Sequence, residues 1–295
     1  MTYHQFVQAV EERVRGCVKG NHAVRVHTAQ KNNGVWRKGI TIEEKGINVS
    51  PTIYLEEYYQ QFRRGISLES ITADILKLYG ELRFQTPWRG ERLRIYQDVR
   101  DKIVYRLISR KRNQELLKEI PYVPYLDLAI VFAVILEIDP HGIATMLIRK
   151  EQLREWGIEK EEVYRQACEN TWKILPVDFQ TMRALIEELT MVLWRENELK
   201  LCVLTNQIKK YGAAAVLYEG QLEAVGQLLG ENYYVLPSSV HEMLILPESC
   251  APEVEQMNQM IAEINEAVVD PEEVLGDHVY YYDREKKEIC WESAQ

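Results

Sequence analysis

The spacing of apolar residues along the chain predicts several amphipathic helices. Apolar residues recur at helical spacing from Phe6 to Val14 and predict a first helix over residues 2–18. Ser67 is the expected N-cap of a second helix, and Gly230 is the expected left-handed C-cap of a later one. The same pattern predicts helices over residues 67–82, 159–176, 178–194, 220–230 and 251–268.

Runs rich in β-branched residues predict strands that are joined into hairpins. Asn33-Gly34 lies between two such runs and favours a hairpin, because both central residues of a type I′ turn need positive φ. The sequence DPHG at 139–142 suits a type I turn in a second hairpin. Pro237 is expected to end the first of two strands within 233–249. Further strand-like runs are at 23–30, 35–44, 128–138, 143–150 and 200–206, with a closing hairpin at 278–291.

The order of these elements predicts the fold class. Hairpins alternate with helices, and no Gly-rich crossover from a strand to a helix is present in the sequence. An α+β fold is therefore expected, with antiparallel or mixed sheets built from hairpins and helices packed on them. Pro87 and Gly90 interrupt the helical pattern. They indicate an N-terminal α+β segment, 1–86, and a main α+β domain, 87–295, with one continuous domain as the alternative.

Composition indicates a folded protein of the cytoplasm. The chain has 295 residues, of which 46% are hydrophobic and 27% charged, enough for a substantial core. The longest apolar run, Leu128 to Leu136, is far shorter than the ~20 residues of a membrane helix. The first residues lack the features of a secretory signal. The 5 cysteines are scattered without a C-x-x-C pair, so we expect reduced thiols and neither disulfides nor a cysteine zinc site.

Charge is distributed unevenly, and the basic part is a candidate for nucleic-acid binding. Residues 83–112 contain ten Lys or Arg and three acids, whereas residues 248–295 contain three Lys or Arg and thirteen acids. Trp88, Tyr96 and Tyr105 lie among the basic residues, a mixture that suits phosphate contacts and base stacking. The alternatives are a solvated helix face or an intramolecular partner for the acidic region. The basic candidates are Arg89, Arg92, Arg94, Arg110, Lys111 and Arg112.

A group of polar residues between two apolar runs is the strongest candidate for chemistry. Ser238, Ser239, His241 and Glu242 are of the types that act as acids, bases and nucleophiles. The sequence HEMLI lacks the second histidine of a zinc protease helix, and the chain has no G-x-S-x-G, P-loop or dinucleotide motif. We therefore expect no metal and no cofactor. Serine hydroxyls that bind backbone groups at a tight corner are favoured over a hydrolase that uses Ser239 and His241.

Four longer segments resemble those of a known family: PTIYLEEYYQQFRRGISLESI, VPYLDLAIVFAVIL, REWGIEKEEVYRQACENTWKILP and YYVLPSSVHEMLILPE. They look like segments of an uncharacterised clostridial family, a domain of unknown function, and are more distantly similar to the YtpQ-like family of bacilli. The resemblance runs from Asn48 to Leu246 and implies no established activity. It adds Asp127 and Asn170 to the binding candidates, although both residue types also cap or brace folds.

These observations favour one function and leave two others open. The favoured function is that of a cytoplasmic bacterial protein without catalysis, an interaction module that binds another protein through oppositely charged faces. The first alternative is nucleic-acid binding through residues 83–112. The second is hydrolysis by Ser239 and His241. No membrane partner is expected.

Overall fold

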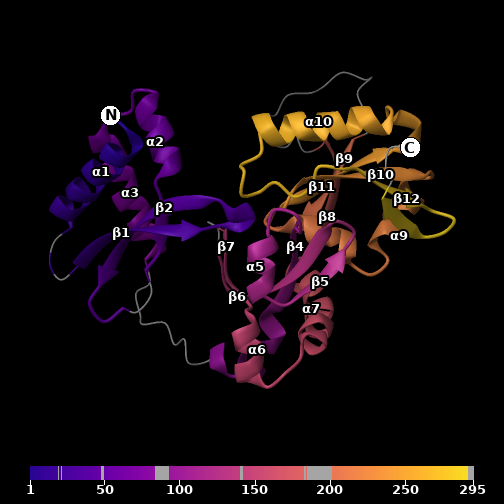
Figure 1. Cartoon of the computed structure of the whole chain (residues 1–295), viewed down its shortest axis with the longest axis horizontal. Coiled ribbons are helices and arrows are strands. Elements are labelled where there is room, and N and C mark those ends of the chain that lie inside the picture. Colours follow the sequence, from indigo (N-terminus) through magenta and orange to yellow (C-terminus); the bar gives the residue numbers. More distant parts are fainter. Residues whose placement is uncertain are drawn as a thin grey trace. The chain divides into compact units, whose positions relative to one another are not determined.

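The chain folds as two compact units, Met1–Glu91 (unit 1) and Arg92–Gln295 (unit 2), each with its own core (Figure 1). The structure is a computed structural model. The boundary predicted near residue 86 lies outside the described residues. These are 1–18, 20, 22–47, 50–83, 93–139, 142–182, 184 and 201–291.

Unit 1 packs helices on an antiparallel sheet. Its elements are α1 (Tyr3–Cys17), β1 (His22–Gln30), the 3-10 turn η1 (Asn32–Gly34), β2 (Trp36–Glu44), β3 (Thr52–Tyr54), α2 (Glu56–Arg63) and α3 (Leu68–Leu82). The strand order is β1-β2-β3. The helices at 2–18 and 67–82 are confirmed, and Ser67 caps α3 by accepting a hydrogen bond from the Ser70 amide, 3.1 Å.

The first hairpin is confirmed, with a longer loop than a two-residue turn. Asn33 and Gly34 have φ of 59° and 71°, the positive values expected for this dipeptide. Gln30 pairs with Trp36, however, so five residues separate the strands, and the Lys31 amide donates to the Val35 carbonyl at 2.7 Å. The turn therefore keeps the predicted backbone signs in a five-residue loop.

Strand alternation places one face of the β1-β2-β3 sheet in the core of unit 1. Val24 pairs with Ile42, and Ile40 pairs with Ile53, so these side chains lie on the same face. They form one hydrophobic cluster with Phe6 of α1 and with residues of α3. The helices and the sheet of unit 1 therefore share a single core.

Unit 2 contains a small sheet around the long strand β6. This part consists of α4 (Tyr96–Val99), η3 (Arg100–Lys102), β4 (Ile103–Ser109), α5 (Gln114–Glu119), β5 (Tyr122–Tyr125), β6 (Leu128–Asp139), β7 (Gly142–Leu147), α6 (Lys150–Trp156) and α7 (Lys160–Ile174). β4, β5 and β7 all pair with β6 in antiparallel fashion. The β6-β7 hairpin is confirmed, whereas Pro140 and His141 of its predicted turn lie outside the described residues.

The second sheet of unit 2 is larger, and its strand order is β13-β12-β10-β11-β9-β8 within the described residues. It is entirely antiparallel, and α10 lies along one face, where Met257 and Ile261 join a cluster with Leu236 and Leu244 (Figure 1). Gly230 caps α9 in the left-handed conformation, as predicted. The elements are β8 (Val177–Thr181), β9 (Cys202–Asn206), η4 (Gly212–Leu217), α9 (Gln221–Leu229), β10 (Tyr233–Ser239), β11 (Glu242–Pro247), η5 (Glu248–Cys250), α10 (Val254–Ala267), β12 (Tyr280–Asp283) and β13 (Glu288–Trp291).

Three local predictions are wrong. The helix predicted over 178–194 starts too early, because residues 178–181 belong to strand β8, which pairs with β9; Met182 and Ala184 are helical, and its other residues lie outside the described ranges. Pro237 does not end β10, because the strand continues to Ser239 through a register shift. Proline is tolerated at such a bulge, where no ladder hydrogen bond is required of it. The helical spacing over 251–268 also predicts an inward-facing Val268, but this residue is 79% exposed.

The α+β fold class is confirmed, with antiparallel sheets and helices packed on them. In the part of the chain that the structure describes, no helix combines the length and the apolar character that crossing a bilayer requires.

Candidate functional site

His241 lies in the tight connection between β10 and β11, and its backbone is fixed on both sides. Its amide donates to the Ser239 hydroxyl at 3.1 Å, and its carbonyl accepts from the Thr205 hydroxyl at 2.7 Å. Ser239 is buried and pairs with Glu242 across the turn, whereas Ser238 lies in the irregular part of β10. The Ser239 hydroxyl therefore serves a backbone group at a corner, the structural alternative expected from the sequence.

Both ring nitrogens of His241 are occupied. The Tyr211 amide donates to Nδ1 at 3.0 Å, and Nε2 lies 2.9 Å from a Glu273 carboxylate oxygen. Because a backbone N–H only donates, Nδ1 must be unprotonated and Nε2 must carry the proton that binds Glu273. Neither nitrogen is bonded to a serine hydroxyl, so this geometry does not support a hydrolase with Ser239 as nucleophile.

The loop 207–211, which carries Tyr211, has an unusual backbone. Lys209 and Tyr211 both have φ of 57°, a left-handed conformation that costs a non-glycine residue on the order of 1–3 kcal/mol. The buried Asn206 side chain holds the loop by accepting from the Ile208 amide, 3.0 Å, and donating to the Lys210 carbonyl, 2.9 Å. The two hydrogen bonds of Asn206, at the end of β9, thus hold the loop in its strained conformation.

Gly212 shows how closely this loop approaches the turn. A Cβ atom at Gly212 would lie 2.5 Å from the His241 carbonyl oxygen and 2.7 Å from the Asn206 amide nitrogen. Both are backbone atoms, which cannot rotate away. Only glycine therefore fits at this crossing of the loop and the β10-β11 turn.

Tyr211 also connects the His241 turn with the small sheet. The Arg106 guanidinium of β4 lies over the Tyr211 ring, 4.0 Å from its centroid, and donates to the Thr145 hydroxyl at 2.6 Å. Burial lowers the pKa of Arg106. Its Nε atom is buried without a hydrogen-bond partner among the residues described. Arg106 is thus a partly buried cation that contacts the loop through the Tyr211 ring.

Glu242 adds a titratable carboxyl to this group. Burial raises its pKa, and the negative charge of Glu273 adds to the effect, whereas His241 and Lys209 act in the opposite direction. The Glu242 carboxyl is therefore a group of this site whose neutral form burial favours. Over the described ranges, no set of three or more His, Cys, Asp or Glu is arranged to hold a metal ion.

Asp127 and Asn170 make structural contacts elsewhere in unit 2. Asp127, at the β5-β6 turn, accepts a hydrogen bond from the Tyr280 hydroxyl of β12 and so ties the two sheets together. The buried Asn170 side chain donates to the carbonyls of Arg100, 2.8 Å, and Ile103, 3.0 Å. Both contacts agree with the bracing role considered from the sequence.

In the described part of the basic segment, strand β4 separates Arg94 from Arg110, Lys111 and Arg112 along the chain. Ile103–Ser109 is the mostly buried strand β4, so the interpretation of this segment as a solvated helix face is wrong. The seven residues of β4 place its two ends about 20 Å apart. Arg94 precedes the strand, whereas Arg110, Lys111 and Arg112 are exposed in the turn after it.

Two of the three aromatic candidates for base stacking, Tyr96 and Tyr105, are engaged by other parts of the protein. Tyr105 is 2% exposed, and the Tyr96 hydroxyl donates to Glu162 at 3.0 Å. Arg112 pairs with Asp277 at 3.1 Å, which agrees with the alternative of an intramolecular partner in the acidic region. The remaining members, Trp88, Arg89 and Arg92, lie outside the described residues.

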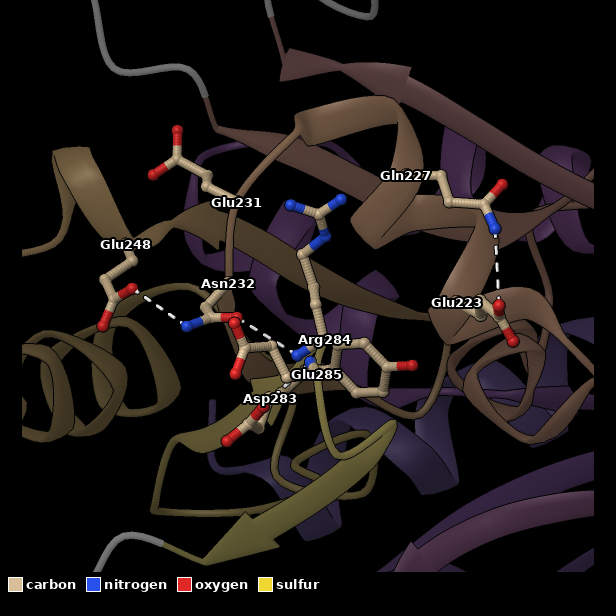
Figure 2. Close-up of a pocket in the computed structure, with 9 residues that line it drawn as sticks. Glu223, Gln227, Glu231, Asn232, Glu248, Asp283, Arg284 and Glu285 are labelled. Carbon is tan, nitrogen blue, oxygen red and sulfur yellow. Dashed lines mark hydrogen bonds between the residues drawn. The ribbon is translucent and has the colours of Figure 1, made fainter.

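An acidic pocket of about 740 Å³ also lies in unit 2, with Arg284 at its centre (Figure 2). Its carboxylates already bind protein groups. Glu231 accepts from the amide and hydroxyl of Ser249 at 2.7 and 2.9 Å, and Glu223 accepts from Lys287 at 2.7 Å. The lining therefore acts mainly to hold α9, η5 and the β12-β13 hairpin together. It consists of Glu223, Gln227, Glu231, Asn232, Glu248, Tyr282, Asp283, Arg284 and Glu285.

No local pattern in the sequence indicates the partners of His241. Tyr211 and Glu273 are separated from it by 30 and 32 residues, and Arg106 comes from another sheet. Positive φ at Lys209 and Tyr211 is equally hidden, because neither residue type favours it. An alignment with paired substitutions at these positions is the signal that identifies such contacts.

Comparison with known proteins places the chain in a family without an assigned activity. No curated protein matches the sequence, and no solved structure matches the fold. The sequence matches the family described as "Family of unknown function (DUF5688)" over residues 3–284, nearly its whole length. The expected resemblance to a domain of unknown function is thereby confirmed, and the chain belongs to this family.

Proposed function

We propose that the protein is a non-catalytic interaction module that binds a basic surface of another protein through α10. Residues 251–283 contain nine Asp or Glu and no Lys or Arg. Glu255, Glu263 and Glu266 of α10 are exposed, and within the described residues none of them forms an ion pair. This uncompensated helix face carries the proposal, because opposite charge on a partner steers and stabilises association.

The helix presents these carboxylates away from the core. Met257 and Ile261 are buried against the large sheet, and with 3.6 residues per turn the three glutamates fall on the opposite side. Met260 is 44% exposed beside them. The exposed area of Met260 supplies an apolar contact, and the glutamates supply charge that complements a basic partner.

Three further observations support the proposal. The candidate residues with known partners form hydrogen bonds to neighbouring protein groups, which favours a binding protein over an enzyme. These residues are Ser239, His241, Asp127 and Asn170. All five cysteines are free thiols, which fits a protein of the reducing bacterial cytoplasm. The basic turn at Arg112 neutralises Asp277, so the available acidic surface is centred on α10.

The test compares two triple charge reversals in the full chain. A tagged protein captures its partner from an extract of the host cell, and the affinity for the purified partner is then measured by calorimetry at low and high salt. Glu255→Lys, Glu263→Lys and Glu266→Lys together are expected to weaken binding at least about tenfold, roughly 1.4 kcal/mol. Higher salt is expected to weaken binding of the unmodified protein.

The control changes net charge equally on other exposed parts of unit 2. Glu155→Lys, Glu169→Lys and Glu219→Lys alter three exposed acids and are expected to leave the affinity nearly unchanged. Equal loss in both triple variants, or binding that does not depend on salt, contradicts a site on α10. Capture of nucleic acid alone would favour binding through the basic segment instead.

A further inference from the structure

We propose that protonation of His241 releases the loop 207–211 from the β10-β11 turn, so that unit 2 carries a built-in response to acidification. This conformational device is independent of the interaction proposed for α10. It follows from the way the imidazole is held, the backbone of the loop and the charges around the ring.

The first step is the bond at Nδ1. The Tyr211 amide donates to the lone pair of His241 Nδ1 at 3.0 Å. Protonation places a hydrogen on Nδ1, so two N–H groups then face each other and the bond is lost. The second nitrogen remains bound to Glu273 in either state, because Nε2 carries a proton in both. Protonation therefore detaches the loop without detaching the segment that carries Glu273.

The second step is the strain in the loop. Lys209 and Tyr211 keep the left-handed conformation only while the bonds around them hold it. When the bond to His241 is lost, relaxation of these two residues favours movement of the loop. Asn206 then still holds the end of the loop near β9, and Arg106 still contacts the Tyr211 ring. A local opening is therefore expected rather than unfolding of unit 2.

The charges that face His241 are mixed. Two carboxylates are close to the ring, because Glu273 contacts Nε2 and Glu242 follows His241 directly in the chain. Two cations lie on the loop side, because Lys209 belongs to the loop and Arg106 contacts the Tyr211 ring. His241 retains partial solvent access, with 18% of its side chain exposed, so a proton can reach it. The segment before β12 also contains Asp270, Glu272 and Asp277, of which Asp277 pairs with Arg112.

The test is amide hydrogen exchange of the Tyr211 region from about pH 8 to about pH 5, the range in which histidines titrate. Exchange rates are corrected for the intrinsic effect of pH. In the unmodified protein, acidification is expected to speed exchange of the Tyr211 amide about fivefold or more, the consequence of one lost hydrogen bond. Peptides from β6 serve as the internal control and are expected to keep their protection.

Two variants separate titration of His241 from other effects of acid. His241→Asn offers an oxygen acceptor that cannot be protonated in this range, so exchange is expected to become independent of pH. Glu273→Gln removes the charge that stabilises the imidazolium, so the transition is expected to move to lower pH. Constant protection in the unmodified protein, a transition that persists in His241→Asn, or an unmoved transition in Glu273→Gln would each overturn the proposal.

Discussion

The two ring nitrogens and the two backbone groups of His241 all have protein partners, so this residue connects the segments around it. Glu242 beside it differs, because it keeps a carboxyl whose pKa burial raises above the ordinary value of 4.5. A raised pKa means that the folded state binds the proton more tightly than the unfolded state. The stabilisation it gives is present at low pH and is lost as pH rises through the raised value.

The raised pKa of Glu242 leads to a prediction for the stability of the variant Glu242→Gln. At neutral pH the variant is expected to be more stable than the unmodified protein, because it removes a charge that is costly to bury. At about pH 4, where the ordinary carboxyl is largely protonated, the difference is expected to shrink towards zero. Urea unfolding at both pH values measures this. The exposed Glu219→Gln is the control, and a variant that is less stable at neutral pH would show that the Glu242 charge is well compensated.

At the scale of elements, the packing of α7 on β4 depends on one buried amide. Asn170 donates to the carbonyls of Arg100 and Ile103, and Gln166 donates to its oxygen at 3.1 Å. Thr171, the next residue, accepts from the Tyr105 amide at the free edge of β4. The helix thus satisfies backbone groups that an edge strand otherwise leaves to solvent.

Asn170→Ala is therefore expected to lower the free energy of unfolding by about 1–3 kcal/mol, because buried carbonyls lose their donor. Equilibrium unfolding in urea measures the change. Glu169→Ala, on the exposed side of the same helix, is the matched control and is expected to stay within about 0.5 kcal/mol of the unmodified protein. If the two variants are equally stable, the prediction is wrong, and water has replaced the Asn170 amide as the donor to these carbonyls.

Elements with a regular apolar period were predictable from the sequence, and those shaped by tertiary contacts were not. The helices α1, α3, α7 and α10 follow from one buried face each, and the hairpins β1-β2 and β6-β7 from their turns. β8 was mistaken for a helix start, because a short half-buried strand has no strong period of its own and depends on pairing with β9.

The same reasoning explains which parts of the candidate site were found. His241 and Glu242 stood out because polar residues follow an apolar strand. Tyr211, Glu273 and Arg106 meet them only through the pairing of distant strands and loops, which periodicity does not encode. The roles of Asp127 and Asn170 were open in the sequence, and the structure supplies the partners that make both of them braces.

At the scale of the whole molecule, the two units differ in net charge, and each unit has its own hydrophobic core. Residues 1–91 contain 13 Lys or Arg and 10 Asp or Glu, whereas residues 92–295 contain 23 and 35. The net negative charge of the protein therefore belongs to unit 2, which also carries α10. The core of unit 1 is a separate hydrophobic cluster, so its stability depends on its own packing.

Phe6→Ala tests this independence. Phe6 is fully buried and packs against Tyr59 and Phe62, with ring centroids 5.2 and 5.4 Å apart. Its truncation is expected to cost unit 1 about 3–5 kcal/mol, a large part of the stability of a small domain. Hydrogen exchange should then show lost protection in α1 and β2 and unchanged protection in β6 and β11. The exposed Gln8→Ala of the same helix is the control. Equal loss of protection in both units would mean that they unfold as one cooperative structure, because two separate cores alone do not transmit the damage.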